Sequence, residues 1–331
     1  MKFAGIIAEY DPFHNGHAWQ LAQAKALGAE RVAVAMSCSL VQRGALPLLP
    51  EAVRTRSALT CGADLVFALP APCACAGAEA FARAGVALLA AAGCDGLVFG
   101  AETPDAALLM EAAELLDSGS YRAALKAQLA GGARSFAAAR QAAAAQLASD
   151  ERVAALLDKP NNNLAVEYCR AIRSLAPRME AYPLPRQGAN HGEALHSAHG
   201  QFASASALRK LWAEGGADAV APYVPEAVFP LYQEAYAAGQ YTDFSAAGRC
   251  ELALLRSACR GKAPFADIRG VSEGLEHRLE AAVRTSTTYD ELLDALTTVR
   301  YPRARMRRLA MDAALGFTAD SLPALPPYLV S

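Results

Sequence analysis

Two histidines three residues apart, His14 and His17, have the types and spacing needed to act on a phosphate. They belong to the segment 10–17 (YDPFHNGH), which follows an apolar run and precedes an alanine-rich stretch. Residues three apart share one face of a helix, and the first turn of a helix offers unpaired N–H groups and a partial positive charge. Transfer at phosphorus depends on donors placed around the developing oxygen charge. The segment therefore predicts a phosphate site, and two loop histidines with structural hydrogen bonds are the alternative.

The elements that must position these histidines are short β-rich runs alternating with alanine-rich stretches. The sequence predicts buried strands at 3–8, 31–36, 64–69 and 96–99, and helices at 16–26, 51–61 and 79–92. This alternation is typical of an α/β fold with a parallel sheet and helices on both faces. Ligands of such sheets bind at the carboxyl ends of the strands. The histidine segment directly follows the first strand, so we expect it at that edge.

The later part of the chain predicts mostly helices. We expect helices over 103–158 and 163–174, a strand at 181–185 and a serine-rich helix start at 203–209. From about residue 215 onward the sequence indicates helices separated by turns. We place the main boundary there, which gives a nucleotide-binding catalytic domain at 1–214 and a mainly helical domain at 215–331.

Composition and charge exclude several classes of protein. Apolar residues make up 53% of the 331 residues, which is ample for a buried core and excludes intrinsic disorder. Lys and Arg number 31 against 33 Asp and Glu, so a polyanion site must be a local patch. The sequence contains no run of about 18 uncharged apolar residues that would span a membrane. We expect a cytoplasmic protein with no membrane partner, and the sequence leaves the oligomeric state open.

A cluster of arginines near the C-terminus is the best local polyanion patch. It consists of Arg300, Arg303, Arg305, Arg307 and Arg308, with Tyr301 among them. Such a patch could hold the phosphates of an RNA while the tyrosine stacks on a base. A solvated basic face of a helix is the alternative.

No metal site is predicted. The eight cysteines follow neither a zinc pattern nor a disulfide framework. His191, Glu193, His196 and His199 invite a metal interpretation, but their spacing matches no standard zinc site.

The H-x-G-H pattern at 14–17 resembles the signature of the HIGH-type nucleotidyltransferase superfamily. A second signature of that superfamily, roughly S-S-T-x-x-R, resembles residues 204–209 (SASALR), with Ser206 in the place of the threonine. The resemblance implies a Rossmann-like nucleotidyltransferase domain in which Ser206 and Arg209 help to hold the leaving phosphates. By itself, the second segment predicts only the capped start of a helix and a surface arginine.

Further segments resemble, in the same order, the bacterial tRNA(Met) cytidine acetate ligases. They lie at 9–17, 41–44, 62–66 with 69–70, 99–102, 160–162, 271–279 and 300–309. The resemblance implies that ATP and acetate form an acetyl-adenylate, which acetylates the wobble cytidine of elongator tRNA(Met) to N4-acetylcytidine. It also implies Mg²⁺ as the usual counter-ion of ATP, and it implies that the helical domain at 215–331 contacts tRNA.

The resemblance carries site residues over position by position. It implies catalytic roles for His14 and His17, and it places Gln42 and Arg43 in the substrate pocket. The implied ATP site comprises Ile7, Ala8, Glu9, Tyr10, Asp11, Pro12, Phe13, His14, Asn15, Gly16, His17, Ala18, Trp19, Gln20, Gly100, Asn161, Asn162, Arg186, Gln187, Ser206 and Arg209.

Departures from the family pattern keep two alternatives open. Cys38 stands where the family usually has glycine, and Ala45 and Ala68 stand where it has glutamate. One alternative is an adenylyltransferase that acts on a small phosphate-bearing acceptor, and the other is a nucleotide- or tRNA-binding protein that has lost catalysis. The sequence contains no Walker G-x-x-x-x-G-K motif, no G-x-G-x-x-G after the first strand and no G-x-S-x-G. Dehydrogenase and hydrolase functions therefore lose their main support.

Overall fold

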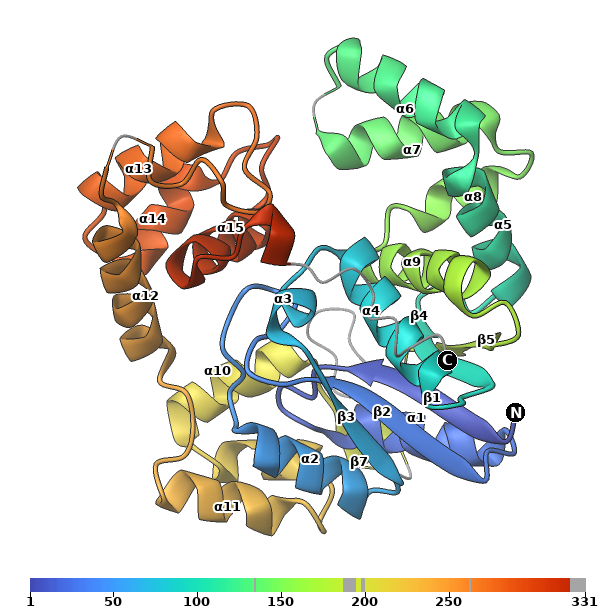
Figure 1. Cartoon of the computed structure of the whole chain (residues 1–331). Coiled ribbons are helices and arrows are strands. Elements are labelled where there is room, and N and C mark those ends of the chain that lie inside the picture. Colours follow the sequence, from blue (N-terminus) through green and yellow to red (C-terminus); the bar gives the residue numbers. More distant parts are fainter. Residues whose placement is uncertain (134, 187–194, 198–199, 262, 322–331) are drawn as a thin grey trace.

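Five parallel strands form the central sheet of the N-terminal half (Figure 1). The structure is a computed structural model that describes residues 1–133, 135–186, 195–197, 200–261 and 263–321. The strands are β1 (Phe3–Ala8), β2 (Arg31–Ser37), β3 (Leu65–Leu69), β4 (Gly96–Ala101) and β5 (Glu180–Pro185), in the order β3-β2-β1-β4-β5. All neighbouring pairs are parallel, so all carboxyl ends lie at one edge. The chain reverses its direction across the sheet between β1 and β4, which is where such folds bind ligands.

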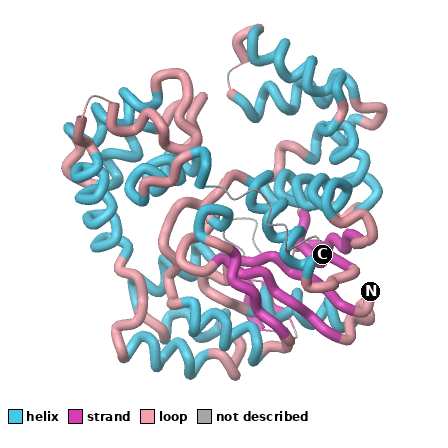
Figure 2. Tube along the Cα trace, viewed as in Figure 1, coloured by secondary structure: helices cyan, strands magenta, loops and turns pink. Residues whose placement is uncertain are grey.

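Alternate residues of the strands enter two separate cores, one on each face of the sheet. Ala33 and Ala35 of β2 belong to one cluster of buried side chains, whereas Val32 and Val34 belong to the other. This is the period of two expected for a strand that is buried on both faces. Figure 2 shows the strands in magenta between two groups of cyan helices. The expected α/β fold with helices on both faces is confirmed.

Each face of the sheet has its own set of helices. The first core contains residues from α4 (Ala78–Ala91), α5 (Ala106–Asp117), α6 (Gly119–Ala130), α7 (Phe136–Leu147), α8 (Glu151–Leu156) and α9 (Pro160–Leu175). The second contains residues from α1 (Asn15–Ala26), α2 (Glu51–Thr60), α10 (Ala205–Gly215), the 3₁₀ helix η1 (Asp218–Tyr223) and α11 (Phe229–Ala237). A short antiparallel pair, β6 (Leu195–Ser197) with β7 (Gly200–Phe202), precedes α10. The α6–α7 hairpin extends away from the sheet (Figure 1).

A third core defines a separate C-terminal helical unit. It is built from α12 (Phe244–Ala258), α13 (Leu275–Thr285), α14 (Tyr289–Leu296) and α15 (Arg303–Leu315), and η2 (Ala319–Ser321) follows. Trp212 of α10 and Tyr232 of α11 are buried in the same cluster as Ile6 of β1. This burial places α10 to α11 with the sheet, although the expected boundary after residue 214 would separate them from it. We propose instead that the division lies between α11 and α12.

The C-terminal unit contacts the sheet domain through α15. Gly44, in the loop that follows β2, has a φ of 76°, and a Cβ atom built on it would lie 2.6 Å from the backbone nitrogen of Arg308. Only glycine allows this close approach in a left-handed conformation. Arg269 pairs with Asp312 of α15 and also donates to the carbonyls of Pro72 and Cys75, beside α3 (Ala71–Ala74). The C-terminal unit therefore covers one side of the carboxyl edge of the sheet.

None of the helices in the described ranges combines the length and the apolar composition needed to cross a membrane.

Candidate active site

A cavity of about 340 Å³ lies at the carboxyl ends of β1 and β4. Most of the expected ATP-site residues line it: Ile7, Ala8, Glu9, Tyr10, Asp11, His14, Gly16, His17, Trp19, Gln20, Gly100, Asn161 and Arg186. Gln42, expected in the substrate pocket, also lines it. A Cβ atom built on Gly100 would lie 3.4 Å from the Cγ of Arg186 and within 4 Å of no other described atom outside the residues adjacent to Gly100. The lining residues extend from Ile7 to Ala205, so the cavity brings segments up to 198 positions apart into one site.

The backbone at the start of α1 fixes both histidine rings. His14 is the residue that caps the helix, and its Nδ1 accepts the N–H of Gly16 at 3.0 Å. The Nδ1 of His17 accepts the N–H of His14 at 3.2 Å. A neutral imidazole whose Nδ1 accepts a hydrogen bond carries its proton on Nε2. Both histidines therefore present an Nε2–H donor, and their rings stack with centroids 3.8 Å apart.

Both histidines are neutral at pH 7. Partial burial, with the guanidinium groups of Arg186 and Arg209, lowers the pKa of His14 from 6.5 to about 3. Burial, His14 and Arg186 also lower the pKa of His17 well below its ordinary range. Loss of water and nearby positive charge both disfavour an imidazolium. The pair can donate two hydrogen bonds to an anion without first gaining a proton.

A buried carboxylate brings two arginines from distant segments to the edge of the cavity. Asp11 is 1% exposed, and its Oδ2 accepts a hydrogen bond from Arg43 and lies 3.4 Å from Nη1 of Arg209. Its Oδ1 accepts the N–H of Leu48. Burial and the neighbouring Arg43 lower the pKa of Arg209 to about 10, which leaves it protonated at pH 7. The two guanidinium groups beside Asp11 can pair with an anionic ligand.

A second polar group lies at the start of α9, where Asn161 lines the cavity. Glu102 accepts the N–H groups of Asn161 and Asn162 at 3.2 and 2.7 Å, and so caps α9. The side chain of Asn161 donates to Glu102 at 2.6 Å and accepts from Arg186 at 2.7 Å. Pro160 suits the first position of a helix because its missing N–H would have no partner there. Asn161 therefore lies in a helical turn that Glu102 and Arg186 hold in place.

Several expected ATP-site residues do not line the cavity. The side chain of Asn162 is buried and exchanges hydrogen bonds with Thr103. Asn15 donates to the carbonyls of Gln201 and Pro222. Ser206 is exposed in the first turn of α10, where Ser204 is the residue that caps the helix. The lining also lacks Pro12, Phe13, Ala18, Ser206 and Arg209. Arg43, expected in the substrate pocket, is absent from the lining as well. Gln187 lies outside the described residues.

The motifs missed several residues that shape the site. These are Phe81 of α4, Leu164 and Tyr168 of α9, and Leu184 and Pro185 of β5. Their only sequence signal is the apolar pattern of the core. Phe99 and Ala205 also line the cavity, and they lie in the motif segments 99–102 and 204–209. The departures at Cys38, Ala45 and Ala68 do not line the cavity.

Arg54 is a further residue that the motifs missed. Its guanidinium is fully buried and donates to the carbonyls of Leu49 at 2.9 Å, Glu9 at 2.8 Å and Ser37 at 2.6 Å, and also to that of Cys38. The carbonyl of Glu9 follows β1, those of Ser37 and Cys38 lie at the end of β2, and that of Leu49 precedes α2. Arg54 thus joins the two strand ends beside the histidine segment.

Most contacts of the C-terminal arginines lie within their own unit, and Arg308 instead reaches the sheet domain. Arg300 pairs with Glu273 at 2.7 Å, and Arg303 pairs with Asp290 at 2.6 Å and with Asp294. Tyr301 is 9% exposed and donates to Glu273, so its ring is not available for stacking on a base in this arrangement. The guanidinium of Arg305 lies over that ring, and Arg308 donates to the carbonyl of Gln42. RNA binding by this cluster, including Arg307, stays a prediction.

Within the described ranges, no group of three or more His, Cys, Asp or Glu side chains could hold a metal ion. His191, Glu193 and His199 lie outside these ranges, and the side chain of His196 is not described.

Comparisons with known proteins identify a family and several relatives of this chain. The HIGH Nucleotidyl Transferase family matches residues 1–328. The tRNA(Met) cytidine acetate ligase of Syntrophotalea carbinolica is 36% identical over 99% of this chain and 78% of that protein. The enzyme of the same name from Acetivibrio thermocellus is 33% identical over 99% of this chain and 80% of its own.

Two solved structures share the fold of this chain. Thermotoga maritima TmcAL bound with alpha-thio ATP superposes with a TM-score of 0.87 at 29% identity, over 97% of this chain and 77% of its own. The apo form gives a TM-score of 0.90 over 98% and 79%, respectively.

Proposed function

This chain belongs to the HIGH nucleotidyltransferase family and, within it, to the tRNA(Met) cytidine acetate ligases, and we infer its function from that membership. The chain is an ATP-dependent ligase that joins acetate to the wobble cytidine of elongator tRNA(Met). The observation that carries this function is a pair of neutral histidines at the start of α1, beside the two arginines that contact Asp11. Neither Nε2–H has a hydrogen-bond partner in the part of the chain that the structure describes. ATP binds in the cavity at the carboxyl ends of β1 and β4.

The first step forms acetyl-adenylate. A carboxylate oxygen of acetate attacks the α-phosphorus of ATP, the bond from that phosphorus to the bridging oxygen breaks, and pyrophosphate leaves. Acetate is already ionised at neutral pH, so the step needs no general base. His14 and His17 donate hydrogen bonds to the oxygens on which charge develops, and Arg209 and Arg43 stabilise the leaving pyrophosphate.

The second step transfers the acetyl group. The exocyclic amine of cytidine attacks the carbonyl carbon of acetyl-adenylate, the carbon–oxygen bond to the phosphate breaks, and AMP leaves. The amine loses one proton, which passes to the phosphate of AMP or to water, and its nitrogen becomes the amide nitrogen of N4-acetylcytidine. We propose that Mg²⁺ enters with ATP as its counter-ion and that the reaction takes place in the cytoplasm, where tRNA is available.

Acetate-dependent exchange of labelled pyrophosphate into ATP tests the first step. With purified protein and a panel of small carboxylates, we expect exchange that requires acetate and needs no RNA, because the adenylate forms before the acceptor reacts. Exchange with a different carboxylate would keep the mechanism but change the substrate. No exchange with any acid, while ATP still binds, would favour the phosphate-bearing acceptor or the loss of catalysis.

A further inference from the structure

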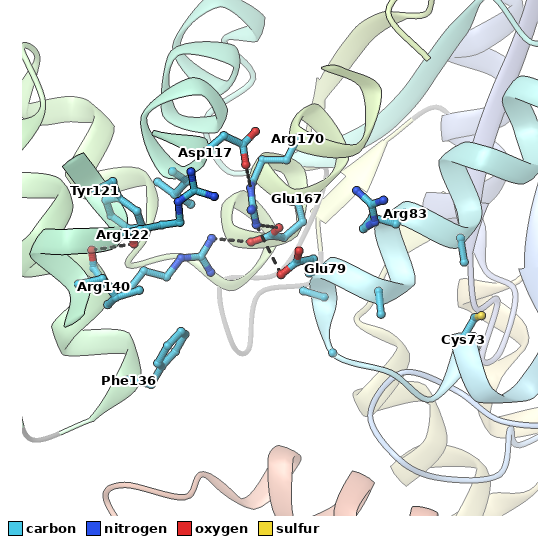
Figure 3. A pocket seen from close by; sticks show the side chains of 16 residues that line it. Cys73, Glu79, Arg83, Asp117, Tyr121, Arg122, Phe136, Arg140, Glu167 and Arg170 are labelled. Carbon is cyan, nitrogen blue, oxygen red and sulfur yellow. Dashed lines mark hydrogen bonds and ion pairs between the residues drawn. The ribbon is translucent and has the colours of Figure 1, made fainter. Parts of the chain in front are cut away.

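A second and larger cavity, of about 850 Å³, lies between α4, the α6–α7 hairpin and α9 (Figure 3). Four arginines line it, Arg83, Arg122, Arg140 and Arg170, together with three carboxylates and Phe136. The lining therefore carries one positive charge in excess, in a chain whose net charge is −2. No step of the proposed adenylation uses these residues.

A buried carboxylate holds two of the four arginines in fixed positions. Glu167 of α9 is 4% exposed and accepts from Arg140 and from Arg170, each at 2.6 Å. Arg170 also donates to Asp117 at 2.7 Å. Figure 3 shows these contacts as a connected network that joins α7, α9 and the end of α5. The network makes the cavity a preorganised site, since its polar groups already have their positions before a ligand arrives.

The other two arginines keep unneutralised charge. Arg83 of α4 donates to the hydroxyl of Ser174 at 3.2 Å and pairs with no carboxylate in the described ranges. Arg122 of α6 is exposed and has no ion-pair partner among the residues that the structure describes. Phe136, at the start of α7, is 53% exposed. Arginines beside an exposed aromatic ring are typical of sites for unpaired nucleotides, because arginine pairs with phosphate and the ring stacks on a base.

The same two helices separate this cavity from the ATP cavity. On α4, Phe81 lines the ATP cavity and Ala84 lines the arginine cavity. On α9, Tyr168 lines the ATP cavity and Glu167 lines the arginine cavity. A ligand in the arginine cavity would therefore lie one layer of helices away from an acetyl-adenylate in the ATP cavity. The cytidine itself must enter the ATP cavity, because its amine attacks the acetyl-adenylate there, so the arginine cavity suits the nucleotides beside that cytidine.

We propose that the arginine cavity binds unpaired nucleotides of the RNA acceptor, next to the cytidine that is acetylated. Arg83 and Arg122 pair with the phosphates, and Phe136 stacks on a base. The proposal rests on the proposed function, because it assigns the position of that reaction's acceptor. The C-terminal arginines fit this role less well, since Arg300 and Arg303 already pair with carboxylates of their own unit.

Charge reversal at Arg122 and removal of the ring at Phe136 test the proposal. We expect R122E and F136A each to raise the KM for elongator tRNA(Met) about tenfold, with unchanged acetate-dependent pyrophosphate exchange. F136W should keep the KM of the unaltered protein, because tryptophan can stack on a base as phenylalanine does. R178E is the matched control: Arg178 is also exposed, but it precedes β5 at the amino edge of the sheet, so it should behave as the unaltered protein.

Fluorescence anisotropy with labelled tRNA gives the dissociation constant without requiring turnover. A weaker affinity in R122E and F136A than in R178E would support the proposal. Equal affinities and equal KM values in all three variants would overturn it. Failure of the proposed function would look different, because acetate would then give no exchange even in the unaltered protein.

Discussion

His14→Asn and His17→Gln are each expected to lower the rate of acetate-dependent pyrophosphate exchange about 100- to 1000-fold. That range is the usual effect of removing one preorganised donor to a developing oxyanion. Each change deletes an Nε2–H donor and adds no charge, because both histidines are neutral at pH 7. The measurement is the exchange rate at saturating acetate and ATP.

These two variants are chosen because they keep the start of α1 intact. Asparagine is a preferred helix-capping residue and can still accept the N–H of Gly16. Glutamine is the usual partner at the position of His17 in a capping box and can accept the N–H of His14. We therefore expect circular dichroism and thermal unfolding close to those of the unaltered protein. Exchange that remains within threefold of normal in both folded variants would contradict the catalytic role.

The lowered pKa values of His14 and His17 determine how the exchange rate and the stability of the fold depend on pH. Between about pH 6 and 8 the histidines stay neutral, so they add no inflection near 6.5 to the exchange rate. In the unfolded chain they take up protons as the pH falls below about 6.5. Their contribution to the stability of the fold is therefore present above that pH and is progressively lost towards pH 3.

Arg54→Met is expected to have the largest effect on stability, about 3 to 5 kcal/mol of the free energy of unfolding. The change leaves the carbonyls of Glu9, Ser37, Cys38 and Leu49 without this donor in a region closed to water. A buried carbonyl without a donor loses its hydration and gains nothing in return. Urea unfolding of the variant and of the unaltered protein measures the difference in their free energies of unfolding.

Arg56→Met is the matched control for Arg54, because Arg56 lies on the same helix and is exposed. It should change the free energy of unfolding by less than about 0.5 kcal/mol. Similar unfolding midpoints for the two variants would show that the carbonyl network contributes little. We also expect weaker ATP binding in Arg54→Met alone, since Arg54 holds the carbonyl of Glu9 beside the ATP cavity.

Local patterns predicted the elements of the sheet domain well. The first strand has the expected bounds, Phe3–Ala8, and β2, β3 and β4 differ from expectation by one or two residues at an end. Their apolar runs are short and clearly bounded, which is the case in which periodicity is most reliable. The placement of His14 and His17 at a strand-to-helix turn follows from the same local signal.

Contacts between distant segments were beyond the reach of such patterns. The sequence gives no sign that Arg54 reaches four carbonyls, or that Asp11 holds Arg43 and Arg209 together. Asn162 has the residue type of a ligand-binding side chain, yet Thr103, 59 positions away, uses its hydrogen bonds. The core shared by α10, α11 and the sheet likewise depends on packing that no motif records.

The most direct test of the central claim supplies the enzyme with labelled acetate, ATP and an elongator tRNA(Met) transcript, followed by digestion to nucleosides. A second transcript carries uridine in place of the wobble cytidine. The account predicts label in N4-acetylcytidine from the first transcript and none in the nucleosides of the second. Label in acetyl-adenylate but in neither RNA, or equal label in both RNAs, would contradict it.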